Sequence, residues 1–246
     1  MATGNTAMTR WICGVGLALT IGSVAASEST AAPVKFWANA RVSIDQHGTP
    51  QRVEPSVKLG EVVRTLVEQR VLRWRFEPAV VEGQAKAGVT YVFLAGCAVP
   101  SSDGTFDVAM AFTGHGPGPV DGELIRRPPA YPPNAARAGN EGRFRVTMRV
   151  GTDGKATLES VDAIEGNARP FREALRAWVG SRLYVPEEVD GMPVSTSISS
   201  EVDFWLPPPG ETGRAPDPTT CEGILAEAVE KSSTTSDSPF KPLDTD

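Results

Sequence analysis

This chain has few histidines, few cysteines and no excess of positive charge, and each of these features excludes a class of function. The 246 residues include two histidines and three cysteines, and the net charge is −6. A zinc site needs several histidine, cysteine or carboxylate ligands at short spacings, and the sequence has no such cluster. An acidic balance gives no electrostatic attraction to nucleic acid or anionic lipid. We therefore expect no metal, no cofactor and no nucleic-acid partner.

Motifs of catalytic chemistry are also missing. No Gly-x-Ser-x-Gly elbow marks a hydrolase serine, and the run Gly114-His-Gly-Pro-Gly lacks the Lys-Ser/Thr of a phosphate loop. His47 falls in a predicted turn and His115 in a glycine–proline loop, each as a lone histidine. Glu187 and Glu188 are adjacent in a turn-like segment with no sign of burial to shift a pKa. We predict no catalytic residues and no enzyme, and an unrecognised enzyme stays as the third alternative.

The N-terminus has the features of a secretory signal. Arg10 precedes an uncharged apolar run from Trp11 to Val24, and Val24-Ala25-Ala26 fits the small-x-small cleavage pattern. The run to Ala26 has 16 residues, whereas a bilayer core needs roughly 20. We predict a signal peptide over 1–26, cleavage after Ala26, a periplasmic location and no membrane span thereafter. The alternative is an uncleaved inner-membrane anchor.

Two cysteines remain after this cleavage, because Cys13 lies inside the apolar run. An even number in an exported protein allows a disulfide. We predict that Cys97 and Cys221 pair and so attach the C-terminal tail to the first half of the chain. The alternative is two buried free thiols.

Two stretches of the chain share an ordered set of features. Each has an alternating strand that ends in a glycine turn, then a helix-like run, then an aromatic segment ending in proline. The turn glycines Gly48 and Gly154 are 106 residues apart, and Pro78 and Pro186 are 108 apart. This order indicates a diverged duplication, and the alternative is chance similarity between two small α+β units.

Hydrophobic periodicity gives the same elements in both stretches. Alternation at Val42–Ile44 and Phe144–Val150 is typical of half-buried strands, and apolar residues at helical spacing follow in 59–66 and 171–179. The final strands are expected at Val89–Leu94 and Ile198–Leu206. The predicted fold class is therefore α+β, with two small units, each an antiparallel sheet of about three strands with a packed helix.

These elements set the expected boundaries. The predicted segments are the signal peptide at 1–26, the first unit at 34–98, a linker with one strand at 99–125, the second unit at 126–207, and a tail at 208–246 that is partly helical and then disordered.

A series of short motifs in the second unit carries a family resemblance. In chain order they are Tyr131-Pro132, Glu141-Gly142, Asp153-Gly154, Tyr184-Val185-Pro186 and Gly191-Met192-Pro193-Val194. In this order, over about residues 126–206, they resemble the TonB C-terminal domain. The first unit lacks Tyr-Pro and Glu-Gly, but its segment from Trp74 to Ala79 is close to the family's usual form.

The resemblance implies binding rather than catalysis. The TonB C-terminal domain contacts outer-membrane transporters in the periplasm and captures a short extended peptide, the TonB box, on a sheet edge, where unpaired backbone groups accept an added strand. Carried over, the resemblance makes Ile198–Leu206 the partner-binding edge, with these candidate residues: Ile198, Ser200, Val202, Asp203 and Phe204. The alternative is that this strand only closes the fold or pairs with the other unit.

The chain also departs from a complete TonB. Its apolar run lacks the polar face that a full TonB turns toward its proton-channel partners, and no long proline-rich spacer follows. The sequence therefore predicts a periplasmic protein that binds an extended peptide or partner protein by strand addition, with a link to outer-membrane transport. The alternative is a structural or envelope-interaction protein that uses the same fold without transporter contact. The sequence makes no prediction of oligomeric state.

Overall fold

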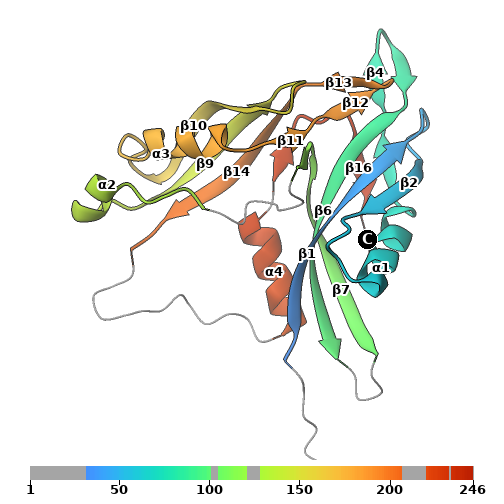
Figure 1. Cartoon of the computed structure of the whole chain (residues 1–246), viewed down its shortest axis with the longest axis horizontal. Helices are drawn as coiled ribbons and strands as arrows, with labels where there is room; N and C mark the ends of the chain where they lie inside the picture. The colour runs from blue at the N-terminus through green and yellow to red at the C-terminus, as the bar shows by residue number, and fades with distance from the viewer. Residues whose placement is uncertain (1–31, 101–104, 121–127, 207–219, 233, 246) are drawn as a thin grey trace, which may run out of the picture. The chain divides into compact units, whose positions relative to one another are not determined.

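A computed structural model describes residues 32–100, 105–120, 128–206, 220–232 and 234–245 (Figure 1). Ala31–Asp246 form one compact unit. The predicted signal peptide, with Cys13, lies outside the described residues. Within the described ranges, no helix is long and apolar enough to cross a membrane.

The first sheet combines strands from the two halves of the chain, and all of its strand pairs are antiparallel. Its strands run in the order β13-β12-β6-β1-β2, and β7 pairs with the same side of β6 as β12. The bounds are β1 Val34–Ile44, β2 Pro50–Pro55, β6 Gly88–Pro100, β7 Phe106–Gly116, β12 Glu187–Val189 and β13 Met192–Val194. The longest pairing joins β1 and β6, from Val34 opposite Ala98 to Ile44 opposite Gly88.

Strand β6 is buried on both faces. On one face Val92 and Leu94 share a core with α1 (Glu61–Val71) through Val67 and Val71. On the other face β6 contacts α4 (Cys221–Ser232), and Figure 1 shows α1 and α4 on opposite sides of this sheet. Two covered faces explain why β6 is a nearly continuous apolar run rather than an alternating one.

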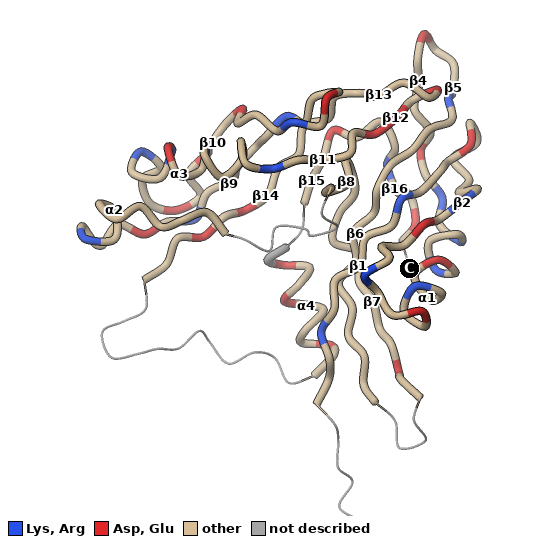
Figure 2. Tube along the Cα trace, viewed as in Figure 1, with Lys and Arg blue, Asp and Glu red and all other residues tan. Residues whose placement is uncertain are grey.

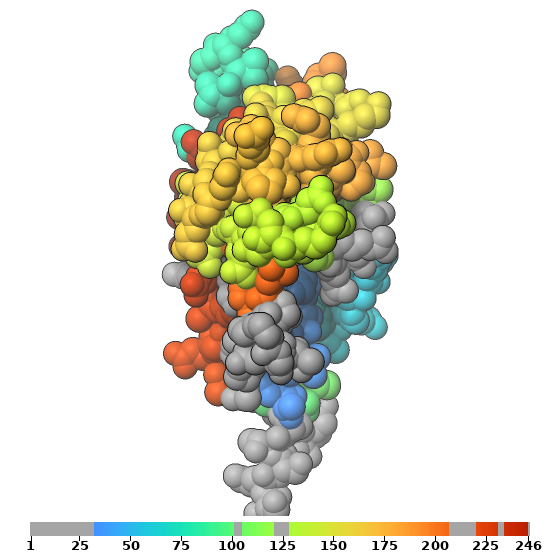
Figure 3. Space-filling view, turned by 90° about the vertical axis from the view of Figure 1, so that its left-hand side faces the viewer, coloured from blue at the N-terminus to red at the C-terminus, as the bar shows by residue number. Residues whose placement is uncertain are grey.

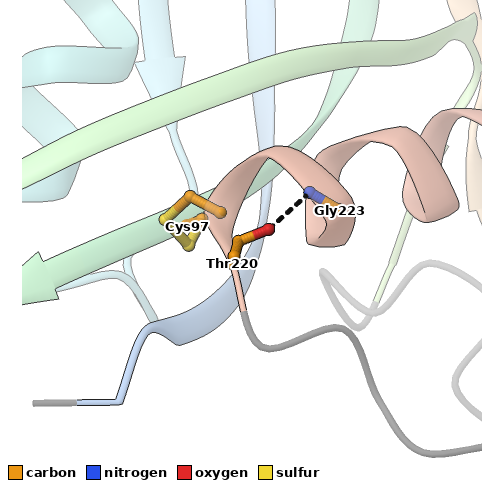
Figure 4. The surroundings of a disulfide bond; sticks show 4 residues. Cys97, Thr220 and Gly223 are labelled. Atoms are coloured by element: carbon orange, nitrogen blue, oxygen red, sulfur yellow. Dashed lines mark hydrogen bonds between the residues drawn. A yellow bond between two sulfur atoms is a disulfide. The ribbon is translucent and has the colours of Figure 1, made fainter.

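The predicted disulfide is present and lies at the start of α4 (Figure 4). Cys97 and Cys221 have Cα atoms 5.4 Å apart and are separated by 124 residues in the chain. The Gly223 N–H donates to the Thr220 hydroxyl at 3.2 Å, so Thr220 caps the helix that the disulfide holds. The bond therefore ties α4 to β6.

The second sheet belongs to the second half of the chain and the tail. It has the order β10-β9-β14-β15, with bounds β9 Gly142–Val150, β10 Ala156–Gly166, β14 Thr196–Phe204 and β15 Thr235–Ser236. The helices of this half are α2 (Pro133–Arg137) and α3 (Arg172–Gly180), shown in lime green and amber in Figure 3. The apolar residues at helical spacing in 171–179 thus fall on α3 and the residue before it.

Aromatic side chains form the centre of the second core. Phe171, just before α3, stacks on Phe204 of β14 with ring centroids 4.3 Å apart, and its ring is tilted against Phe144 of β9 at 5.2 Å. These three rings bury the inward face of β9 and β14 under α3, and all are at most 4% exposed. Burial of such rings contributes about 1.5–3 kcal/mol each.

The two halves have the same local connections. The order β2-β1-β6 in one sheet corresponds to β10-β9-β14 in the other. In both, the turn glycine accepts a hydrogen bond from an aromatic residue: Phe76 N–H donates to Gly48 O at 2.9 Å, and Tyr184 N–H to Gly154 O at 2.8 Å. The remaining short strands are β3 Arg75–Glu77, β4 Ala79–Val81, β5 Gln84–Lys86, β8 Gly118–Pro119, β11 Tyr184–Val185 and β16 Lys241–Asp244.

The predicted linker and tail both contribute strands to the fold. The one strand expected in the segment 99–125 is β7, which pairs with β6 from Tyr91 to Pro100. The end of the tail, expected to be disordered, forms β15 and β16, and Phe240 between them is fully buried in the first core. The expectation of disorder was wrong for 234–245. It relied on the polar local composition, which does not show that one aromatic side chain is buried and that the backbone pairs with distant strands.

Replacement of Gly154 by alanine tests the turn contact. Gly154 has φ +76°, and an added Cβ would lie 2.1 Å from the Tyr184 carbonyl oxygen, so the turn must separate from β11. We expect Gly154→Ala to lower the free energy of unfolding by more than about 3 kcal/mol, measured by urea denaturation. Gly139→Ala is the control, because Gly139 has φ +64° with open space around it. It should lose only about 1 kcal/mol, and equal losses would contradict the contact.

Removal of the disulfide tests the attachment of α4. The double variant Cys97→Ser/Cys221→Ser should lose about 2–5 kcal/mol of unfolding free energy, because the cross-link closes a long loop in the unfolded chain. Guanidinium denaturation of the oxidised proteins measures it. A midpoint equal to that of wild type would show that the cross-link adds nothing to stability.

Candidate partner-binding edge

The side chains of β14 alternate between the core and the outside. Four of the five predicted partner-binding residues face the core and are 4–7% exposed: Ile198, Ser200, Val202 and Phe204. The fifth, Asp203, is exposed. A partner at this strand therefore meets its backbone and its outward-facing side chains, while the four inward side chains hold the sheet to α3.

The outward face of β9 and β14 carries cross-strand ion pairs. Arg143 Nε lies 2.9 Å from Asp203 Oδ1, and an Arg145 guanidinium nitrogen lies 3.2 Å from Glu201 Oε1. Figure 2 shows basic and acidic residues interspersed along this sheet. Exposed pairs of this kind contribute at most about 1 kcal/mol each. Their main effect is that the face has charges of both signs, so it does not select a partner by net charge.

The backbone of β14 has one side paired along its length and one side paired only at its start. On the β15 side, Asp237 N–H donates to Ser197 O at 3.0 Å, and Ser197 N–H donates to Asp237 Oδ1 at 2.6 Å. Backbone groups alternate sides along a strand, so those of Glu201 and Asp203 face this same side. The pairing with β15 covers Ile198 and Ser199. Among the described residues, no strand pairs with this side beyond Ser199.

Two motif residues fix the end of β14. The Tyr131 hydroxyl donates to Asn140 O at 2.5 Å, and its ring stands edge-on to Phe204 with centroids 5.4 Å apart. Glu141 Oε1 accepts the Leu206 N–H at 2.6 Å. Tyr131 and Glu141 therefore hold the end of β14, beyond the part that pairs with β15.

The other motif residues shape turns and close contacts. Pro132 is the extended residue before α2, and a Cβ on Gly142 would lie 2.5 Å from the Phe144 ring. Asp153 Oδ1 accepts the Lys155 N–H at 3.1 Å, and this bond lowers the pKa of Asp153. Asp153 and Gly154 together form the turn before β10. The motif is thus structural, and it supports the edge without forming it.

Glu187 is a buried carboxyl that the sequence did not reveal. It was expected in an exposed turn, but it is fully buried at the start of β12. The Thr90 and Ser238 hydroxyls donate to its Oε1, each at 2.5 Å, and the Thr196 hydroxyl donates to its Oε2 at 2.6 Å. Burial raises the pKa of Glu187, and the three hydroxyl donors oppose that rise. Glu187 therefore joins β6, β14 and the tail through a single side chain.

His115 also differs from its expected place. It lies within β7 rather than in a loop, is partly buried, and has a neighbouring aromatic ring, Phe112, at 6.0 Å between centroids. Burial lowers the pKa of His115 to about 4, and the positive charge of Lys241 adds to this. The ring is therefore neutral at neutral pH. Within the described ranges, no three His, Cys, Asp or Glu side chains are grouped to hold a metal.

The fold defines a class of protein: a mixed α+β protein of mostly antiparallel sheets with few helices. Residues 127–206, about a third of the chain, match the family model described as Gram-negative bacterial TonB protein C-terminal. The resemblance predicted for 126–206 is thereby confirmed. No curated protein matches the chain.

The family match gives a coarse functional class. TonB C-terminal domains are periplasmic in Gram-negative bacteria and interact with proteins such as outer-membrane transporters. They serve binding and energy transduction rather than catalysis, which is consistent with the expectation that this protein is not an enzyme. The match indicates an envelope or transport-related protein.

The buried carboxyl makes a prediction for the pH dependence of stability. As pH rises, the unfolded chain ionises Glu187 near the ordinary glutamate pKa of 4.5, whereas the folded protein keeps the proton until its raised pKa. The stability contributed by the protonated form is therefore lost as pH rises through this window. Glu187→Gln mimics the protonated acid, so its unfolding free energy should fall less with pH than that of wild type.

Urea denaturation between pH 4 and 9 provides the measurement. Glu188→Gln is the control, because Glu188 is adjacent but partly exposed, and its curve should run parallel to that of wild type. Parallel curves for Glu187→Gln and wild type would contradict a buried Glu187 carboxyl with a raised pKa.

Proposed function

We propose that this protein is a periplasmic TonB-like binding protein that takes up an extended peptide or partner strand along the outer side of β14, in connection with outer-membrane transport. The observation that carries the proposal is that no strand in the described part of the chain pairs with the β15 side of β14 at Glu201 and Asp203. An unpaired sheet edge is a template for an added strand. The added strand would run antiparallel to β14, in line with β15.

The corresponding edge in the first half is occupied, which directs the proposal to the second half. Along β6, β12 pairs with Gly88 and Val89, and β7 pairs from Tyr91 to Pro100. That side of β6 therefore has no position for a partner strand. Along β14, by contrast, the described pairing stops at Ser199.

We further propose that residues 34–98 are a diverged copy of the domain in 126–207. Support comes from the equivalent sheet orders and from the two equivalent glycine contacts at Gly48 and Gly154. The tight turns also correspond, with positive φ at Glu82 and Gly83 and again at Asp190 and Gly191. In this proposal the first copy has a structural role, because β12 and β7 pair with the side of β6 that corresponds to the β15 side of β14.

A structural role in the envelope is the second candidate. The observation that favours it is β15, because the chain's own tail already pairs with the start of β14. In that case the edge closes the fold, and a transporter peptide has no site on it.

A pair of substitutions at Glu201 separates these functions. Glu201→Ala removes the side chain and its ion pair with Arg145 but keeps the N–H, whereas Glu201→Pro also removes the N–H on the open side. Proline is tolerated where the N–H of a strand faces solvent. If a partner strand binds here, Glu201→Pro should weaken the binding of a TonB-box peptide about tenfold relative to Glu201→Ala, since a lost backbone hydrogen bond costs about 1–1.5 kcal/mol.

Isothermal titration calorimetry measures the affinities, and amide chemical shifts of Glu201 and Asp203 locate the peptide. Thermal unfolding of both variants confirms that the fold is retained. No amide shift at saturating peptide, or no binding to wild type, would remove the strand-addition proposal and favour the structural role.

A further inference from the structure

We propose that the tail strand β15 is an internal ligand of the partner edge, and that an incoming strand displaces it to pair with the full length of β14. This inference rests on the proposed function. It begins from the fact that β15 is the only strand among the described residues on the outer side of β14. The tail is therefore placed where a partner would bind.

β15 lies in a slot between the two sheets. On one side Ser236 is opposite Ile198 of β14, and on the other the Thr234 N–H donates to Thr113 O of β7 at 2.9 Å. The β7 wall contains Gly114 and Gly116. A Cβ on Gly114 would lie 2.8 Å from the Thr234 carbonyl oxygen, so the missing side chain admits a backbone.

The fit of β15 in the slot is incomplete. The Ser200 and Ser236 hydroxyls are buried without a hydrogen-bond partner in the described part of the chain. Ser236 is opposite Ile198, so Ser200, two residues further along β14, lies on the same face of the sheet. Each unsatisfied hydroxyl reduces what the contact contributes. A strand that supplied a partner to the Ser200 hydroxyl would bind better than the tail, and the Ser236 hydroxyl would return to water when the tail leaves.

The tail is anchored on both sides of β15, whereas β15 itself has only a two-residue ladder with β14 and the hydrogen bonds of Thr234 and Asp237. Before it, α4 is cross-linked through Cys221. After it, Phe240 is fully buried and Ser238 donates to Glu187. Between these anchors Thr235 and Asp237 are exposed. The segment 234–237 can therefore leave β14 while the rest of the tail stays bound.

The slot also indicates the chemistry of the partner. Its present occupant reads Thr-Thr-Ser-Asp, with small side chains beside the glycines of β7 and a carboxylate that accepts the Ser197 N–H at 2.6 Å. The partner that fits is an extended segment with small residues at these positions, followed by an acidic residue.

A cross-link that fixes the tail tests the displacement. Ser199 and Thr235 are opposite each other in the ladder, at a spacing that suits a disulfide. The oxidised double variant Ser199→Cys/Thr235→Cys should bind a TonB-box peptide at least about tenfold more weakly than wild type. The single variants control for loss of either hydroxyl and should bind like wild type.

A substitution that loosens the tail should have the opposite effect. Asp237→Ala removes the acceptor of the Ser197 N–H at an exposed position, so peptide binding should tighten about three- to tenfold. Glu173→Ala, an exposed acidic residue on α3, is the charge-matched control and should leave affinity unchanged. Unaltered affinity in both the cross-linked and the Asp237→Ala proteins would overturn the internal-ligand proposal while leaving strand addition on β14 intact.

Hydrogen exchange of the free protein gives a readout that needs no partner. The Thr234 and Asp237 amides should exchange at least about 100-fold faster than those of Ser200 and Val202, which face β9, because only a local opening is required. Equal rates would mean that the tail opens only with the whole fold, and the proposal would fail even if a peptide bound. Fast tail exchange without peptide binding to any variant would instead count against the proposed function.

Discussion

The requirement that each strand edge find backbone partners organises this protein. A strand exposes N–H and C=O groups on two sides, and groups left unpaired away from water are costly. In the first half, β12 and β7 complete the outer side of β6. In the second half, β15 completes only the start of β14. Among the described residues, this side is thus fully paired in one sheet and partly paired in the other, and the proposed function follows from this difference.

Glu187 shows how the two sheets and the tail depend on one another. Its carboxyl receives hydroxyl hydrogen bonds from Thr90, Thr196 and Ser238. A buried carboxyl is costly unless it is hydrogen-bonded or protonated. The three donors come from separate parts of the chain, so the group is satisfied only when β6, β14 and the tail are all in place. This polar contact makes their assembly more specific than apolar packing alone would.

Local patterns in the sequence predicted the elements but not their long-range partners. Alternation and the Asp153-Gly154 turn located β9 and β10, and the even cysteine count gave the disulfide. The apolar stripe expected in 59–66 includes Val62, which is 64% exposed, whereas Val67 and Val71 beyond it are buried. Only tertiary contacts decide the rotation of α1 about its axis, and with it which side chains are buried. For the same reason the edge was predicted as a strand, while its occupant, β15, was not.

In the proposed function, recognition depends on which groups of β14 remain available, and here the ion pairs matter. Arg143 and Arg145 are paired with Asp203 and Glu201 across the outward face, so that face does not rank partners by charge. The inward side chains are committed to the core. The groups that remain belong to a short length of backbone, whose hydrogen bonds depend on the strand geometry of the partner more than on its sequence. In the proposed binding mode, selectivity then comes from the neighbouring slot, where Gly114 permits close approach of a backbone and the Ser197 N–H favours an acceptor.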